Sequence, residues 1–304
     1  MKDIVIEVNK LRKVYGNSVA VDNISFDVRK GEIFALLGPD GSGKTTILEC
    51  LEGLRKPDGG SVKLMGINPN YNHSNLHNLI GVQLQTPGLP ANMRVSEAMN
   101  FFCTYHNKSP RYDLLERLGF KEKMDAQYQT LSKVQQKKLA IALAIAHKPP
   151  ILILDEPTTD FDVQSRVELH NIIIELQEKN TTILLSTPNM AEASKLAAHM
   201  IILWRGKKIT AGTPLEVTAT GARLAKISVR VVGSSLSEPG TKFPSVTKSL
   251  LKDEYKIYYS NNPGLTVSAI IKHISKQKDE LIDMRVERSL EERFMEITDN
   301  EIKL

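Results

Sequence analysis

Residues 33–46 read IFALLGPDGSGKTT: five apolar residues, a glycine-rich turn, then a lysine and two threonines. The turn fits the spacing G-x-x-x-x-G-K-[ST], follows an expected strand and opens a helical pattern, which is the context in which this motif binds phosphate. Glycines let main-chain N–H groups converge on phosphate oxygens, because no Cβ blocks their approach. The helix N-terminus adds a favourable dipole for an anion. We therefore expect a nucleoside triphosphate to be bound by the loop of Gly38, Pro39, Asp40, Gly41, Ser42, Gly43, Lys44, Thr45 and Thr46.

A second apolar run, Ile151–Leu154, ends in two acids, Asp155 and Glu156. In phosphoryl-transfer sites, a lysine such as Lys44 contacts the β- and γ-phosphates, and a hydroxyl such as that of Thr45 ligates Mg²⁺. Asp155 can hold the same ion, and Glu156 can polarise the attacking water as a catalytic base. A turn that only caps the strand is the alternative, but its pairing with the phosphate loop favours the catalytic interpretation.

Short β-rich runs alternate with helical patterns along the first two thirds of the chain. The apolar strands are typical of strands covered by helices on both faces, so we predict an α/β fold with a parallel core. Residues 86–146 lack strand signals and are expected to form a helical subdomain within a first domain of residues 1–220. The expected strands are Ile4–Val8, Ser25–Val28, Ile33–Leu37, Ser61–Met65, Ile80–Leu84, Ile151–Leu154, Thr182–Ser186 and Met200–Trp204.

The composition shifts after Thr210, where the turn Ala211–Pro214 precedes a short helix. Residues 221–304 are predicted to form a small α+β domain. Its expected elements are strands at Lys226–Val232, Tyr255–Tyr259 and Ile282–Glu287, and helices at Val267–Ser275 and Leu290–Ile297.

Composition limits the class of protein. The 304 residues are 25% charged and 41% hydrophobic, with a net charge of +5 that does not distinguish phosphate ligands, an anionic membrane or nucleic acid as partners. Two cysteines without a CxxC pattern argue against a disulfide framework or a zinc site. No apolar run reaches the ~18 residues that a membrane span needs. We expect a soluble, cytoplasmic protein, so that any membrane function requires another chain.

The order of the motifs resembles that of an ABC-transporter nucleotide-binding domain over about Ile4 to Thr213. The phosphate loop and the acidic strand end are its Walker A and Walker B motifs. The resemblance implies a RecA-like P-loop NTPase core with an antiparallel β portion. It also implies that Tyr15, in Lys13-Val14-Tyr15-Gly16, stacks on adenine. Gln85, in Gly81-Val82-Gln83-Leu84-Gln85, would sense Mg²⁺ and the γ-phosphate.

Residues 131–136 read LSKVQQ and stand where the family has its signature Leu-Ser-Gly-Gly-Gln. By resemblance, Ser132 and Gln135 would bind ATP, as would Asp162 of the D-loop. Ser132 and Gln135 also fit a capping box, so a helix start is expected there in any case. The sequence departs from the family in having Lys133 and Val134 in place of the signature glycines. It departs again in having Pro188 where the switch-loop histidine stands.

The resemblance also implies partners and cofactors. ATP with Mg²⁺ would lie between two ATP-binding subunits, in a homodimer or a heterodimer, and residues 86–118 would receive the coupling helices of a membrane permease. Residues 289–298, SLEERFMEIT, resemble the ending of daunorubicin-resistance ATPases, which serve ABC-2-type multidrug exporters. The chain would then lie on the inner face of the cell membrane through its permease, and no nucleic-acid partner is expected.

These observations predict an energy-coupling transporter ATPase. Loss of a positioned transition-state donor typically costs ~10²–10³ in rate, so the departures at Lys133, Val134 and Pro188 suggest slow turnover. One alternative is a regulatory module that binds ATP and dimerises with little hydrolysis. A third is an ABC protein acting on ribosomes or DNA, which the single phosphate loop and the lack of a heptad run disfavour.

Overall fold

The structure is a computed structural model that describes residues 3–71, 73–86, 88–219, 225–233, 235–236 and 242–287. The chain divides into two compact units, residues 1–214 and 215–304. The predicted domain boundary, between residues 220 and 221, falls among residues outside the described ranges. No helix in the described residues is long and apolar enough to cross a membrane.

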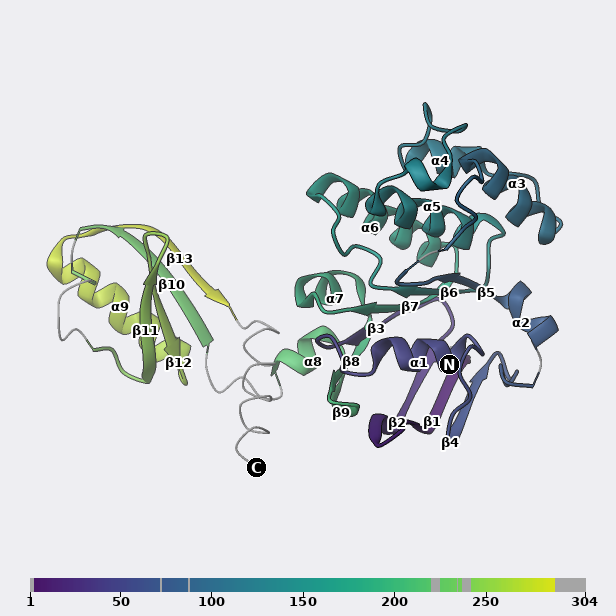
Figure 1. The fold of residues 1–304 in the computed structure, drawn as a ribbon. Coiled ribbons are helices and arrows are strands. Elements are labelled where there is room, and N and C mark those ends of the chain that lie inside the picture. The colour runs from purple at the N-terminus through teal and green to yellow at the C-terminus, as the bar shows by residue number, and fades with distance from the viewer. Residues whose placement is uncertain are drawn as a thin grey trace. The chain divides into compact units, whose positions relative to one another are not determined.

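A six-stranded sheet forms the centre of the first unit (Figure 1). Its first five strands are parallel and the last is antiparallel to its neighbour. Every residue of β3, β6 and β7 is buried, because helices cover both faces of this part of the sheet. The strand order is β5 (Ile80–Gln83), β6 (Ile151–Asp155), β7 (Thr182–Thr187), β3 (Ile33–Leu37), β8 (His199–Trp204) and β9 (Lys207–Gly212).

Helices α3 (Val95–Tyr105), α4 (Tyr112–Arg117), α5 (Lys133–Ala146) and α6 (Val163–Glu178) lie on one side of this sheet (Figure 1). On the other side, α1 (Lys44–Leu51) packs between the sheet and a second, antiparallel sheet. That sheet has the order β2 (Ser18–Arg29), β1 (Ile4–Tyr15) and β4 (Gly59–Leu64). The shorter α2 (His73–Leu79) precedes β5, and α7 (Met190–Leu196) packs on β3 and β7.

The described residues of the second unit form an antiparallel sheet that packs against helix α9 (Pro263–Gln277). Its strand order is β11 (Val246–Lys252), β12 (Tyr255–Ser260), β10 (Ala225–Val232) and β13 (Glu280–Glu287). Helix α9 supplies Ile270 and Ile274 to a core that includes Ile227 and Tyr258 (Figure 1). The helix α8 (Pro214–Ala219) connects to this unit in sequence.

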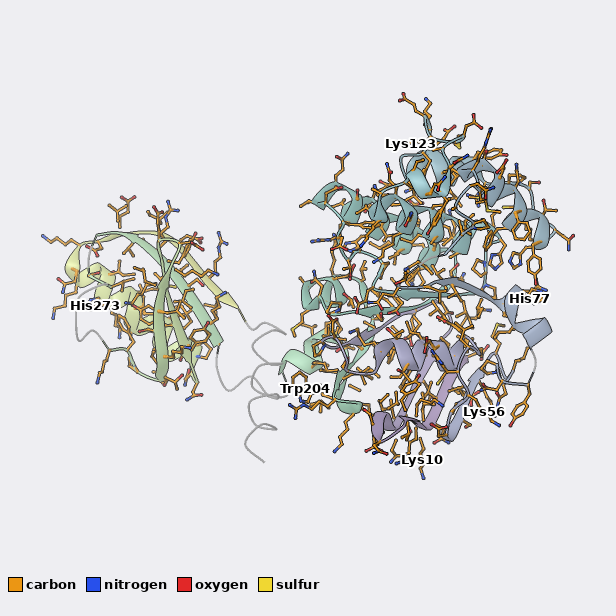
Figure 2. All side chains as sticks on the ribbon, viewed as in Figure 1. Lys10, Lys56, His77, Lys123, Trp204 and His273 are labelled. Carbon is orange, nitrogen blue, oxygen red and sulfur yellow. The ribbon has the colours of Figure 1, made fainter. Side chains whose placement is uncertain are left out.

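The predicted fold class, an α/β core with an antiparallel portion, a helical part and a small α+β part, is confirmed. Strands β9 and β11 were not predicted, and β1 and β2 extend beyond the predicted runs. Register shifts interrupt the β1–β2 pairing, so the sequence lacks the steady alternation that marks a long strand. The predicted helix Leu290–Ile297 and the 289–298 motif lie outside the described residues. The only tryptophan, Trp204, ends β8 in the first unit (Figure 2).

Candidate functional site

The phosphate loop has the backbone that its glycines were expected to provide. Gly41 and Gly43 have φ of 75° and 102°, in the left-handed region that glycine tolerates best. A Cβ on Gly43 would lie 2.6 Å from the main-chain oxygen of Ala20, so no larger residue fits. A Cβ on Gly41 would meet nothing within 4 Å, which leaves an open cradle above the loop. Ser42 adds a buried hydroxyl that has no hydrogen-bond partner among the described residues.

Lys44 is the first residue of α1, and its side chain is 3% exposed. Its ammonium donates to the carbonyl oxygens of Gly38 and Pro39, at 2.8 and 2.9 Å. It also lies 3.2 Å from Oε1 of Glu156, whose side chain is 7% exposed. The predicted phosphate-binding lysine and the predicted catalytic glutamate are therefore an ion pair in this structure.

Asp155 ends β6 beside the first turn of α1. Its Oδ2 accepts a hydrogen bond of 2.8 Å from the Thr45 hydroxyl, and Oδ1 accepts one from the Ser186 hydroxyl. These oxygens suit Mg²⁺, which is commonly held by one or two protein groups together with phosphates and water. The described residues contain no cluster of three or more His, Cys, Asp or Glu side chains that could hold a metal without phosphate.

Glu156 follows directly, with φ of 48°, and several elements fix it. Its main-chain N–H lies 3.0 Å from Oγ of Ser186, and its carbonyl accepts a 2.9 Å bond from the ammonium of Lys137 on α5. Burial lowers the pKa of Lys137, and the surrounding carboxylates oppose this effect. The side-chain amide of Gln85, just beyond β5, donates to Oε2 of Glu156 at 3.4 Å. Sequence reasoning named Gln85 but missed Ser186 and Lys137.

Three of the predicted ATP-binding side chains form the N-terminal caps of α5 and α6. Ser132 and Gln135 form the predicted capping box at the start of α5, with hydrogen bonds of 3.2 and 3.0 Å. Asp162 accepts from the N–H and the hydroxyl of Ser165, both at 2.8 Å, at the start of α6. In the described residues these bonds stay within each helix, so this single chain does not bring the three side chains to Lys44.

The remaining predicted positions are Tyr15, Asp40 and Thr46. Tyr15 ends β1 with 40% of its surface exposed, and the cations of Lys13 and Arg55 lie 5.6 and 5.8 Å from its ring centre. Asp40 is exposed at the tip of the loop, and Thr46 lies in the first turn of α1.

The departures from the expected signature and switch loop have clear positions. Lys133 is exposed at the start of α5, and Val134 packs against the helical core. Pro188 follows β7, and the next side chain, that of Asn189, caps α7 by accepting a 3.1 Å bond from the N–H of Glu192. No side chain at positions 187–189 of the switch loop is a histidine.

A buried polar network lies behind this loop. Oε1 of Glu192 lies 3.0 Å from Nε2 of His170 and accepts a 2.7 Å bond from the Thr158 hydroxyl. Burial opposes ionisation of Glu192, but hydrogen bonds from His170, Thr187 and Thr158 outweigh it and lower the pKa. The network joins α6, α7 and the turn that follows Glu156.

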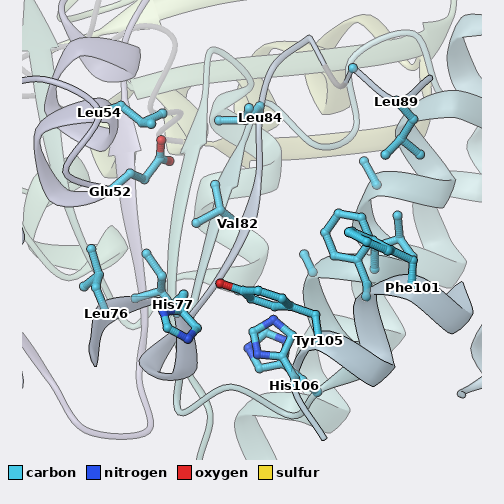
Figure 3. A pocket seen from close by; sticks show the side chains of 18 residues that line it. Glu52, Leu54, Leu76, His77, Val82, Leu84, Leu89, Phe101, Tyr105 and His106 are labelled. Carbon is cyan, nitrogen blue, oxygen red and sulfur yellow. The ribbon is translucent and has the colours of Figure 1, made fainter. Parts of the chain in front are cut away.

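A pocket of about 550 Å³ opens beside β5 in the first unit (Figure 3). We call it the β5 groove. It lies between the end of α1, helix α2 and strand β5 on one side and helices α3 and α5 on the other. Most of its lining is apolar or aromatic and includes Leu54, Leu76, Val82, Leu89, Phe101 and Tyr105.

Comparison with known proteins identifies the class. The profile of the family described as ABC transporter matches residues 21–159. The chain is 31% identical to Nod factor export ATP-binding protein I of Cupriavidus metallidurans, over 98% of this chain and 99% of that protein. It is 36% identical to the protein of the same name from Ralstonia nicotianae, over 70% of this chain and 68% of that one.

Solved structures show the same fold at 24% identity. A structure described as an ATP-binding subunit of an ABC transporter superposes with a TM-score of 0.65, covering 71% of this chain and 92% of that one. The dimeric cassette MJ0796 with ADP and Pi superposes with a TM-score of 0.63, covering 69% and 98%. The chain belongs to the ABC transporter family and is an ATP-binding subunit of that family. Such subunits bind ATP, dimerise and pair with membrane permease subunits to energise transport.

Proposed function

We propose that this chain is the magnesium-dependent ATPase of an exporter, acting from the inner face of the cell membrane through its permease. The observation that supports this most is the convergence of Lys44, Asp155 and Glu156, with the Lys44–Glu156 contact at 3.2 Å and the Thr45–Asp155 bond at 2.8 Å. Export is favoured because the relatives that match nearly all or most of the chain are Nod factor export proteins.

The side chains divide the work of hydrolysis. The amides around Gly41 and Gly43 and the ammonium of Lys44 would bind the phosphates, with Tyr15 beside the adenine. Thr45, Asp155 and Gln85 would hold magnesium, which neutralises phosphate charge when bound. Glu156 would accept the proton of the attacking water.

The ion pair between Lys44 and Glu156 has a consequence for this sequence of events. A triphosphate competes with Glu156 for the lysine ammonium. When Lys44 turns to the phosphates, the Glu156 carboxylate would be released from the ammonium and could accept a hydrogen bond from the attacking water. Main-chain bonds to Ser186 and Lys137 keep Glu156 in place during this exchange.

The test of this assignment is binding of Mg·ATP to the purified chain by isothermal calorimetry. Wild type should bind, and Lys44→Ala should lose most of the affinity. Lys123→Ala is the control, because this lysine is exposed among the helices of the first unit, away from the phosphate loop (Figure 2). Equal binding by wild type and Lys44→Ala would refute the proposed site.

Slow turnover is part of the proposal. In the dimer, ATP would lie between the phosphate loop of one subunit and Ser132 and Gln135 of the other, where Lys133 and Val134 replace the expected glycines. Steady-state turnover should rise by ~10²-fold or more in a variant carrying Lys133→Gly, Val134→Gly and Pro188→His, because positioned donors are restored. An unchanged rate would contradict the impairment.

A second candidate function is a regulatory subunit that binds ATP and dimerises with little hydrolysis. It is favoured by the switch loop, where Pro188 has no donor and the Asn189 side chain is occupied in capping α7. Glu156→Gln separates the two functions. If it prolongs ATP occupancy, Glu156 is a working base, whereas unchanged occupancy supports the regulatory function.

We also propose that the β5 groove receives a cytoplasmic helix of the permease. Its walls come from Glu52 and Leu54 at the end of α1, from α5, and from the segment 76–106, which overlaps the predicted permease-facing segment. An apolar groove of this kind fits an amphipathic helix, as in other helix-in-groove complexes. We expect no nucleic-acid partner.

A further inference from the structure

One carboxylate lines the β5 groove, and it belongs to Glu52 at the C-terminal end of α1. The residue is 8% exposed, and its buried Oε2 has no hydrogen-bond partner among the residues that the structure describes. In Figure 3 the carboxylate lies near the side chain of Leu54, on the wall of the pocket. A buried carboxylate is costly unless it is paired, so a partner outside this chain would satisfy it.

The charges around Glu52 do not compensate for it. Glu49, on the same helix, and Asp155, on β6, are both negative, and after burial they are the causes that raise the pKa of Glu52 to about 8. The nearby cation Arg55 forms an ion pair with Glu49, in which Nε of Arg55 lies 2.9 Å from Oε2 of Glu49. The electrostatic field at this end of α1 therefore favours a positive charge from elsewhere.

The two stacked histidines of the groove are neutral near neutral pH and therefore do not pair with Glu52 as cations. His106 and His147 stack with ring centres 3.9 Å apart. Burial lowers the pKa of His147 to about 4, with the neighbouring His106 adding to the effect. Burial likewise lowers the pKa of His106. Among the described residues that line the pocket, none is a lysine or arginine.

We infer that the permease helix entering the β5 groove carries a lysine or arginine whose cation pairs with Glu52. This inference rests on the proposed function and adds the chemistry of the partner segment. Apolar side chains of the helix would contact Leu76, Val82 and Phe101, and the basic side chain would reach across to the carboxylate. Pairing in a groove closed to water gives the interaction both strength and selectivity.

The first arm of the test identifies the segment. A photoreactive phenylalanine analogue is placed at Tyr105, which is 59% exposed at the groove, in the full chain expressed in its own cells. Irradiated membranes are digested, and the cross-linked peptide is sequenced by mass spectrometry. We expect a cytoplasmic segment of a multi-span membrane protein that contains a lysine or arginine. A membrane segment without a basic residue would overturn the pairing and leave the proposed function standing. If no membrane protein is cross-linked, the proposed function fails as well.

The second arm tests the charge. Glu52→Gln should weaken binding of the detergent-purified permease by about thirtyfold or more, because loss of one member of a buried charge pair costs at least about that factor. Glu49→Gln, a carboxylate of the same helix that pairs with Arg55, is the matched control and should change binding less than threefold. Replacing the permease cation with methionine should cost as much as Glu52→Gln, and the double variant should bind no worse than either single one. A Glu52→Gln affinity within threefold of wild type would overturn the inference.

Discussion

Replacing Glu52 with glutamine should raise the free energy of unfolding of the first unit at alkaline pH. This stabilisation should be absent at acidic pH. Burial, reinforced by Asp155 and Glu49, raises the pKa of Glu52 from 4.5 to about 8. A carboxyl whose folded-state pKa is raised destabilises the fold once it must ionise. The penalty is absent below pH 4.5, grows between pH 4.5 and 8, and is complete above pH 8.

The magnitude follows from the size of the shift. The interval from 4.5 to about 8 is about 3.5 pH units, and at about 1.36 kcal/mol per unit it corresponds to about 5 kcal/mol. At pH 7, which lies about 2.5 units above 4.5, the penalty for ionising Glu52 is about 3 kcal/mol. Glutamine does not titrate, so the difference in unfolding free energy between variant and wild type should grow by these amounts from pH 4.5 upward.

Urea unfolding followed by Trp204 fluorescence measures this difference, because the only tryptophan lies in the first unit. Titrations at pH 5, 7 and 8.5 without nucleotide give the free energy of unfolding of each protein. Groups common to both proteins cancel in the comparison. A difference that stays constant from pH 5 to 8.5 would refute the unpaired, buried state of Glu52.

Three further predictions concern the loop and its supports. Gly43→Ala should cost about 1–3 kcal/mol of stability in urea unfolding, because φ is 102° and a Cβ would clash with β2, whereas Gly41→Ala should cost less since its Cβ meets nothing. Ser132→Ala should lower stability by about 1 kcal/mol through loss of the α5 cap, again measured in urea. Glu192→Gln should cost about 1–3 kcal/mol, because the buried ring of His170 and the hydroxyl of Thr158 lose a charged acceptor, and unchanged stability would contradict this role.

The phosphate site could be predicted because its chemistry is local in the chain. Nine consecutive residues specify the turn, the helix start and the lysine, and Asp155 and Glu156 follow an apolar strand that can only be buried. Ser186 and Lys137 could not be found in this way, because they reach Asp155 and Glu156 from 31 and 19 residues away in the sequence. Only the parallel pairing of β6 with β7 and the packing of α5 bring them there.

Strand β11 and Glu52 escaped prediction for related reasons. The sequence of β11, VTKSLLK, does not alternate between apolar and polar residues, and most of its side chains are exposed. Glu52 stands at the C-terminal end of a helix, and glutamate side chains are mostly exposed, so the sequence gives no reason to expect a buried one. Its burial depends on the approach of β5 and of Leu54, which no local pattern reveals.

Helix α1 connects the two sites physically. Its first residue is Lys44 in the phosphate loop, and Glu52 caps its other end at the β5 groove, after about 12 Å of helix. Burial is the main cause of the raised pKa of Glu52, and repulsion from Asp155, the expected magnesium ligand, adds to it. A permease cation beside Glu52 would offset this repulsion, and so would a magnesium ion beside Asp155. Each positive charge reduces the benefit that the other brings, so the two binding events are coupled, and linkage makes the coupling equal in both directions. The affinity for the permease should therefore differ between measurements with and without Mg·ATP in the wild-type protein. Glu52→Gln should reduce this difference. An equal difference in both proteins would show that the coupling runs through other contacts.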